Sequence, residues 1–221
     1  LGASITFGWG VEDDATYPAN LARFVGVEVI NAGMPAAKPG HIAQWLTIHA
    51  STIDADVVVF GARPNWDVPN PIQDYTNAVM ASEAAIAPAQ LAIILPPIST
   101  FDPLGVRESA NEAKQLRDAL QGRPILELTD AFRERQKGPG VVMETDGSTQ
   151  RMVRLPNREL VAEGSGSGDH LAPEIIAAFE EDHTLVEPLF FDGGHPDAKG
   201  YKLFAEQVAQ YLRDNRWVPS P

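Results

Sequence analysis

The sequence predicts an α/β fold: a three-layer sandwich in which helices flank a mostly parallel, flavodoxin-like sheet of about five strands. Three short apolar runs lack the polar alternation of half-exposed strands, and such runs are typical of strands covered on both faces. They are residues 56–60, 91–95 and 124–128. Helix-forming segments alternate with them, at residues 41–50, 75–87 and 106–120. This alternation indicates βαβ units and parallel pairing.

The start of the chain is expected to contribute one further helix and one further strand. The helix is expected at residues 16–24, with Asp13 or Asp14 as its N-cap and Gly26 just past its end. The strand is expected at residues 27–31. Before the helix lies a turn of small residues, and we expect it at the carboxyl edge of the sheet.

Residues 137–169 interrupt the alternation of strands and helices. The segments VVME at residues 141–144 and RMVR at residues 151–154 flank an Asp-Gly pair, which is typical of a β-hairpin. The stretch has too few apolar residues for a core of its own. We therefore interpret it as an insertion or lid within a single domain that spans residues 1–221. Helices are expected beyond it, at residues 172–180 and 198–212.

The composition excludes several classes of function. The chain has 221 residues and a formal net charge of −13, which argues against binding to nucleic-acid backbones or anionic membranes. It contains no cysteine, so disulfides, thiolate metal sites and cysteine nucleophiles are excluded. No apolar run reaches the ~18 residues that a membrane-spanning helix requires. We expect no metal and no cofactor, and the composition does not predict an oligomeric state.

Two distant stretches carry residues suited to chemistry. Ser4 lies in the opening small-residue turn, where its side chain either caps a helix or is exposed at the sheet edge. Asp192 precedes His195 by three residues across two glycines, so its carboxylate can hydrogen-bond the imidazole and set its tautomer. Asp192 and His195 could instead cap a helix, or supply two ligands of a metal site.

The two ends of the chain together resemble the GDSL, or SGNH, hydrolase family. The segment GASITFG at residues 2–8 resembles its first block, Gly-Asp-Ser-x-Thr-x-Gly. NAGMP at residues 31–35 resembles the second block, and DGGHPDAKG at residues 192–200 closely resembles the last. The family aspartate is Ala3 in this chain. The third block, Gly-x-Asn-Asp, corresponds only loosely to GARPNWD at residues 61–67.

The resemblance implies acyl transfer through a serine nucleophile. Ser4 would be the nucleophile, His195 the general base, and Asp192 the residue that orients the base. The oxyanion hole would consist of the backbone amides of Ser4 and Gly33 and the side-chain amide of Asn65. Asn70 is a poorer substitute for Asn65, and Asn65 could also be an ordinary turn residue.

Three further residues of the expected site region could contact a substrate. Trp9 and Trp66 could form a platform for a sugar ring or an acyl chain, or could simply be packed. Arg63 could bind a substrate carboxylate or phosphate, or could form a salt bridge within its loop.

The leading interpretation is therefore a serine esterase that acts on a carbohydrate O-acetyl group or another short acyl ester. An O-acyltransferase would use the same acyl-enzyme. A catalytically weak domain of the same type could bind a glycan or a protein partner. A flavodoxin-like binding module would use residues 4–8 to hold a phosphate. The family places its first strand directly before the nucleophile, so we expect native residues upstream of Leu1, with any targeting segment among them. An envelope or secreted location fits the family.

Overall fold

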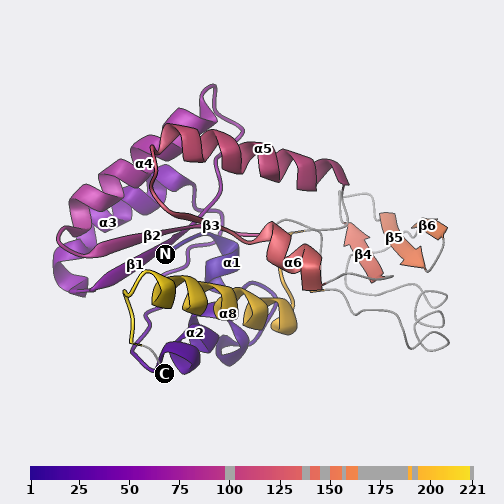
Figure 1. Ribbon diagram of the computed structural model, residues 1–221, viewed down its shortest axis with the longest axis horizontal. Coiled ribbons are helices and arrows are strands. Elements are labelled where there is room, and N and C mark those ends of the chain that lie inside the picture. Colours follow the sequence, from indigo (N-terminus) through magenta and orange to yellow (C-terminus); the bar gives the residue numbers. More distant parts are fainter. Residues whose placement is uncertain are drawn as a thin grey trace.

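Helices cover both faces of a parallel sheet in the computed structural model (Figure 1). The structure describes residues 1–97, 103–135, 140–144, 150–155, 158–163, 189–190 and 194–219. The sheet has the order β1-β2-β3 and is parallel throughout. Its strands are β1 (Val57–Gly61), β2 (Gln90–Leu95) and β3 (Ile125–Glu127). All three coincide with the predicted apolar runs.

The strand predicted at residues 27–31 is wrong: the structure assigns no strand there. Next to β1, on the side away from β2, parallel pairing consists of single bridges, from Gly2 to Gly33 and from Gly2 to Gly61. The amide of Gly61 also donates to the Leu1 carbonyl at 2.8 Å. Leu1 and Gly2 therefore lie between β1 and Gly33. The helical turn that begins at Ser4 ends this extended segment, and its pairing on each side is a single bridge.

One helical layer lies against the face of the sheet to which Ile93 and Leu95 of β2 contribute. The intervening Ala92 and Ile94 pack on the opposite face. This period of two, apolar on both sides, is what a strand covered on both faces requires. The helices of the layer are α3 (Pro39–Ile53), α4 (Pro71–Ile86) and α5 (Pro103–Ala119), which overlap the three helices predicted for this part of the chain.

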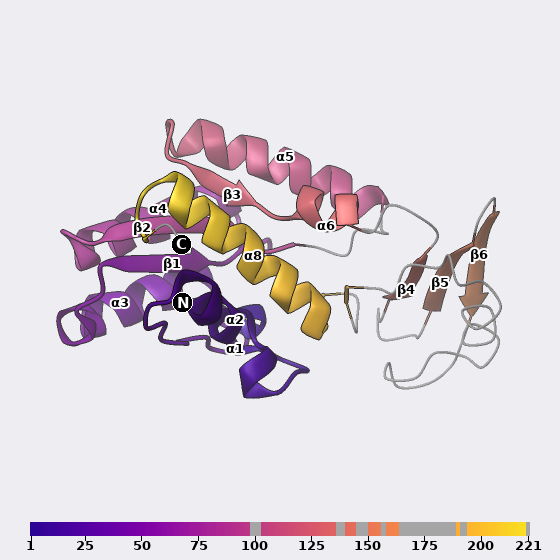
Figure 2. The ribbon, with the colours of Figure 1, turned by 60° about the horizontal axis from the view of Figure 1, so that its bottom comes forward.

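The opposite layer contains helices from both ends of the sequence. Its helices are α2 (Tyr17–Val25), α6 (Thr129–Arg135) and α8 (Ala198–Asp214). Tyr17 of α2 stacks on Phe204 of α8, with ring centroids 4.1 Å apart. Figure 2 shows α8 lying across the strands, with α2 beside it. None of the helices in the described ranges is both long enough and apolar enough to cross a membrane.

The N-cap of α2 differs from the prediction. Thr16, and not Asp13 or Asp14, is the cap: its hydroxyl accepts a hydrogen bond from the Ala19 amide at 3.3 Å. The Thr16 hydroxyl also donates to the Asp13 carbonyl at 3.0 Å, because the two aspartates form a separate 3-10 turn before the helix. Gly26 ends α2 with a φ of 68°, as predicted.

The hairpin predicted within residues 137–169 is present, with a third strand beside it. The antiparallel sheet consists of β4 (Gly140–Glu144), β5 (Gln150–Leu155) and β6 (Arg158–Glu163). The strand β6 was not predicted, because no turn signal of the Asp-Gly type precedes it. The role of this stretch as an insertion or lid stays a prediction. The helix predicted at residues 172–180 lies outside the described residues.

Candidate active site

Ser4 is the first residue of a single helical turn that follows the short Leu1–Gly2 segment. This turn is α1 (Ser4–Phe7), and Gly8 ends it with a φ of 97°. The carbonyl of Ser4 accepts hydrogen bonds from the amides of Gly8 and Trp9, each at 3.0 Å. Because the preceding segment runs parallel to its neighbours, Ser4 lies at the carboxyl edge of the sheet. Open α/β sheets bind their ligands at this edge.

Two glycines allow this turn to pack tightly. A Cβ atom on Gly2 would lie 2.0 Å from the Thr6 hydroxyl oxygen and 2.3 Å from the Gly61 carbonyl oxygen. A Cβ atom on Gly33 would lie 2.1 Å from the Phe7 amide nitrogen. At both positions the neighbouring atoms lie closer to the glycine than a residue with a Cβ atom would permit. Thr6 is buried beneath the turn and is hydrogen-bonded to the Tyr17 hydroxyl at 3.1 Å, which ties α1 to α2.

His195 lies directly beside Ser4. Its Nε2 atom is 2.8 Å from Ser4 Oγ, and 191 residues separate the two positions in the sequence. The indole of Trp9 lies next to the imidazole, with ring centroids 6.4 Å apart. Tyr201 of α8 donates its hydroxyl hydrogen to the Trp9 carbonyl at 3.2 Å. The structure thus brings together Ser4, His195 and Trp9.

The segment that holds His195 is fixed at the start of α8. Phe190 and Pro196 form an antiparallel bridge, and the Asp197 amide donates to the Leu189 carbonyl at 2.9 Å. Asp197 caps α8, because its side chain accepts a hydrogen bond from the Gly200 amide at 2.7 Å. Burial raises the pKa of the Asp197 carboxyl, and hydrogen bonds from backbone amides oppose this shift. The predicted orienting residue, Asp192, lies outside the described residues, so its role stays a prediction.

Gly33 lies close to the turn, but its amide already has an acceptor. It donates to the side-chain oxygen of Asn31 at 3.0 Å. Asn31 Nδ2 in turn donates to the Phe7 carbonyl at 3.3 Å. The Asn31 side chain is exposed and can rotate away. For the Gly33 amide to bind a substrate oxygen, this oxygen must replace Asn31 Oδ1.

Asn65 lies four residues beyond the end of β1, and the oxygen of its carboxamide is hydrogen-bonded. Asn65 Oδ1 accepts hydrogen bonds from Lys38 Nζ at 3.1 Å and from the Asp67 amide at 3.3 Å. No residue in the described ranges accepts a bond from its Nδ2 group. The alternative, Asn70, is exposed at the N-terminus of α4 and does not use its side chain as a cap.

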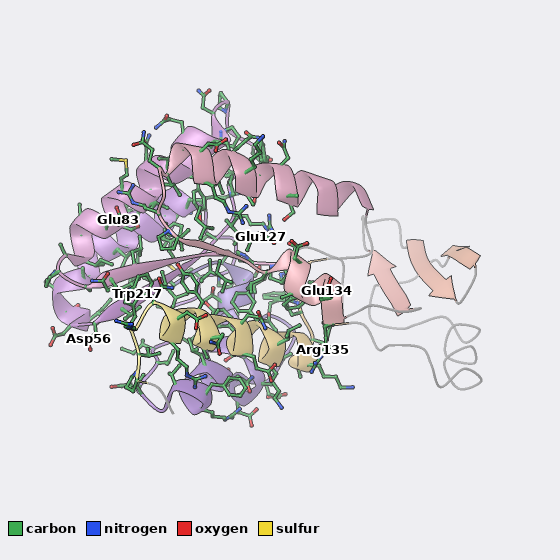
Figure 3. The ribbon with its side chains drawn as sticks, viewed as in Figure 1. Asp56, Glu83, Glu127, Glu134, Arg135 and Trp217 are labelled. Carbon is green, nitrogen blue, oxygen red and sulfur yellow. The ribbon has the colours of Figure 1, made fainter. Side chains whose placement is uncertain are left out.

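The guanidinium of Arg63 is occupied within the fold. Arg63 Nη1 donates to Glu112 Oε1 at 2.6 Å, and the side chain of Glu112 is only 5% exposed. The other partners of Arg63 are the Pro96 carbonyl, Ser109 Oγ, Glu127 Oε1 and Thr129 Oγ1. Figure 3 labels Glu127, the last residue of β3. The donors of Arg63 are therefore engaged by protein groups, and its salt bridges reach α5 and β3 rather than a residue of its own loop.

Trp66 binds the same buried carboxylate as Arg63, that of Glu112. Its indole Nε1 donates to Glu112 Oε2 at 2.9 Å, while 57% of the residue stays exposed. Burial raises the pKa of Glu112; the nearby charge of Arg63 opposes this, and Glu127 adds to it. Several polar residues of this region were not predicted from the sequence: Lys38, Ser109, Glu112, Glu127 and Thr129. Within the described parts of the chain, no three His, Asp or Glu side chains form a cluster that could hold a metal ion.

Comparison with solved structures identifies the fold. A GDSL-family lipolytic protein from Desulfitobacterium hafniense matches with a TM-score of 0.57 and 16% identity, over 96% of this chain and 97% of that one. A GDSL-family protein from Veillonella parvula matches with a TM-score of 0.52 and 14% identity, over 96% and 95% of the two chains. A two-domain esterase active on acetylated mannans matches with a TM-score of 0.54 and 15% identity. That match covers all of this chain and 50% of the esterase.

These likenesses show that the chain has the fold of GDSL/SGNH lipolytic proteins and esterases, at low sequence identity. No protein-family model and no curated protein matches the sequence.

Proposed function

We propose that the protein is a serine esterase in which Ser4 is the nucleophile and His195 the general base. The observation that carries this proposal is the 2.8 Å distance between Ser4 Oγ and His195 Nε2. A serine hydroxyl is a weak nucleophile until a base accepts its proton, and this distance is within the range that such a transfer needs. The likeness of the whole fold to GDSL esterases supports the same chemistry.

The first half-reaction forms an acyl-enzyme. Ser4 Oγ attacks the ester carbonyl carbon while its proton passes to His195 Nε2, and the carbonyl oxygen becomes an oxyanion. The carbon–oxygen bond to the alcohol then breaks, and His195 returns the proton to the departing alkoxide. Asp192 is proposed to accept a hydrogen bond from the other imidazole nitrogen and so to stabilise the imidazolium.

The oxyanion would be held by donors at the turn and the neighbouring loops: the amides of Ser4 and Gly33 and Nδ2 of Asn65. The Ser4 amide belongs to the first turn of α1, whose amides have no acceptor within the helix. Each such donor contributes about 3 kcal/mol to lowering the barrier. The Gly33 amide can contribute only after Asn31 Oδ1 gives up its hydrogen bond.

The second half-reaction distinguishes an esterase from an O-acyltransferase. In an esterase, water donates a proton to His195 and attacks the acyl carbon, which releases a carboxylic acid and regenerates Ser4. In a transferase, a sugar hydroxyl takes the place of water and the product is a new ester. The same residues serve both outcomes, so analysis of the products with and without a sugar acceptor separates them.

For the substrate, we propose a short acyl ester on a carbohydrate. Trp9 is 52% exposed beside His195, and Trp66 is 57% exposed one residue beyond Asn65. The Trp66 ring is also held in place by Glu112. Aromatic faces held in this way can stack on sugar rings. One structure with this fold is an esterase active on acetylated mannans, which supports this substrate class.

The test compares wild type with Ser4→Ala and Ser51→Ala on p-nitrophenyl acetate and on an acetylated manno-oligosaccharide. Ser51 is exposed on α3 and serves as the matched control. We expect Ser4→Ala to lose activity on both substrates and Ser51→Ala to keep it. Equal rates for wild type and Ser4→Ala would overturn the proposal.

A further inference from the structure

We propose that Lys38 is a positioning residue for the esterase reaction: its ammonium group orients the Asn65 carboxamide so that Nδ2 faces the oxyanion. This inference rests on the proposed function, because it requires that Asn65 hold the oxyanion. Lys38 Nζ lies 3.1 Å from Asn65 Oδ1 and 3.2 Å from Asp67 Oδ2. Lys38 lies just before α3, and Asn65 follows β1, so the contact joins two separate loops.

The backbone on either side of Asn65 is fixed by one buried carboxylate. Arg63 binds Glu112 Oε1 at 2.6 Å, and Trp66 binds Glu112 Oε2 at 2.9 Å. Glu112 belongs to α5, which packs on the body of the fold through the buried side chains of Ala113 and Leu116. The loop is therefore anchored just before and just after Asn65. What stays variable is the rotation of the Asn65 side chain itself.

Two donors determine this rotation. The Lys38 ammonium and the Asp67 amide both donate to Asn65 Oδ1. If the carboxamide turned over, its NH₂ group would face these two donors and lose both bonds. Nδ2 is thereby directed away from Lys38. The positive charge on the oxygen side also draws electrons from the carboxamide, so its N–H groups become stronger donors.

The contact is exposed, so its removal can be studied in a folded protein. The side chains of Lys38 and Asp67 are 46% and 82% exposed, and exposed ion pairs contribute little to stability. The backbone at Lys38 is held independently, because its amide donates to His41 Nδ1 at 3.3 Å at the start of α3. Loss of the ammonium group therefore leaves the Asp67 amide as the remaining donor to Asn65 Oδ1, which weakens the constraint on the carboxamide and leaves both loops in place.

The experiment uses Lys38→Met, Lys38→Arg and the control Lys202→Met, an exposed position on α8. We expect Lys38→Met to lower kcat on p-nitrophenyl acetate by roughly three- to tenfold, the range of one ordinary intramolecular hydrogen bond, with KM unchanged. Lys38→Arg retains most of the activity, and Lys202→Met retains all of it. Affinity for an alkylboronic acid, which forms a tetrahedral adduct on the serine, falls in Lys38→Met by the same factor as kcat. The thermal midpoint shifts by no more than about 4 °C.

A double variant separates positioning from a general effect. Asn65→Ala alone is expected to lower kcat by on the order of 100-fold. Adding Lys38→Met to Asn65→Ala should cause no further loss, because the group that Lys38 orients is gone. A further three- to tenfold loss in the double variant, or an unchanged kcat in Lys38→Met alone, would overturn the inference while the esterase proposal stands. Full activity of Asn65→Ala would overturn both the inference and the proposed oxyanion role of Asn65.

Discussion

Ser4 Oγ and His195 Nε2 lie 2.8 Å apart, although they come from opposite ends of the chain. The contact depends on two different kinds of support. Gly2, just before the Ser4 turn, has no Cβ atom and so lies close against Thr6 and Gly61. The capped start of α8 holds the segment that carries His195. Because α2 and α8 pack against each other, the two ends of the chain form one side of the site.

The Asp192 side chain should be required for the function of His195. We expect Asp192→Asn to lower kcat on the order of 10³-fold or more, because an amide in its place favours the wrong imidazole tautomer. KM and the thermal midpoint should change little. Steady-state kinetics on p-nitrophenyl acetate measure the effect, and Asp197→Asn, at the α8 cap, is the control. Wild-type activity in Asp192→Asn would remove this residue from the proposed mechanism.

Gly2→Ala should destabilise the protein and abolish activity together. The added Cβ atom would lie 2.0 Å from Thr6 Oγ1 and 2.3 Å from the Gly61 carbonyl oxygen, which belongs to rigid backbone. Overpacking of this kind lowers the free energy of unfolding by about 1–3 kcal/mol. Gly40→Ala is the matched control, because a Cβ atom there meets nothing within 4 Å. Urea denaturation measures both variants, and equal stability of Gly2→Ala and wild type would contradict the packing of the turn.

The Glu112 carboxyl should make a pH-dependent contribution to stability. Burial raises its pKa above the ordinary 4.5, so the folded protein binds a proton that the unfolded chain has released. This contribution is fully present below pH 4.5 and is lost as the pH rises through the folded-state pKa. The free energy of unfolding of wild type, relative to Glu112→Gln, should therefore increase as the pH is lowered from 7 toward 4.5.

Denaturant titrations of both proteins at several pH values measure this difference. Glu28→Gln, at an exposed position, is the control for the loss of a surface charge. If wild type instead gained stability relative to Glu112→Gln as the pH rose, the pKa of Glu112 would be lowered rather than raised.

Trp9 should affect carbohydrate substrates selectively. Its ring is half exposed beside His195, while its backbone carbonyl is held by Tyr201 whatever the side chain. We expect Trp9→Ala to raise KM for an acetylated manno-oligosaccharide by roughly three- to tenfold, the contribution of one aromatic contact. Its kcat/KM on p-nitrophenyl acetate should stay within about twofold of wild type. An equal loss on both substrates would contradict a sugar-stacking role.

The strands of the parallel sheet were predictable because their apolar runs are continuous. A strand covered on both faces needs such a run, and Ile93 and Ile94 face opposite layers as expected. The strand expected at residues 27–31 was not predictable in this way, since its formation depends on a partner and not on its own composition. The structure assigns no bridge to residues 27–31, and Gly2 pairs with Gly33, just beyond them.

The site was partly predictable for a similar reason. The motif residues Ser4, Gly33 and His195 are local signals, and the structure brings Ser4 and His195 together. The hydrogen bonds of Lys38 and Glu112 join loops and helices far apart in the sequence, which no local pattern reveals. One signal was available: Glu112 falls one residue before Ala113 and four before Leu116, which are buried on the same helix. A polar side chain in an apolar stripe indicates a buried partner.

The most direct test of the central claim is covalent labelling by a fluorophosphonate, followed by peptide mapping with mass spectrometry. The serine oxygen displaces fluoride from phosphorus, so only an activated serine is labelled at low reagent concentration. We predict one phosphonyl group per chain, on the peptide that contains Ser4, and no labelling of Ser4→Ala or His195→Ala. Labelling of Ser4 at the same rate in wild type and His195→Ala, or no labelling of wild type, would contradict the assignment of Ser4 and His195 as nucleophile and base.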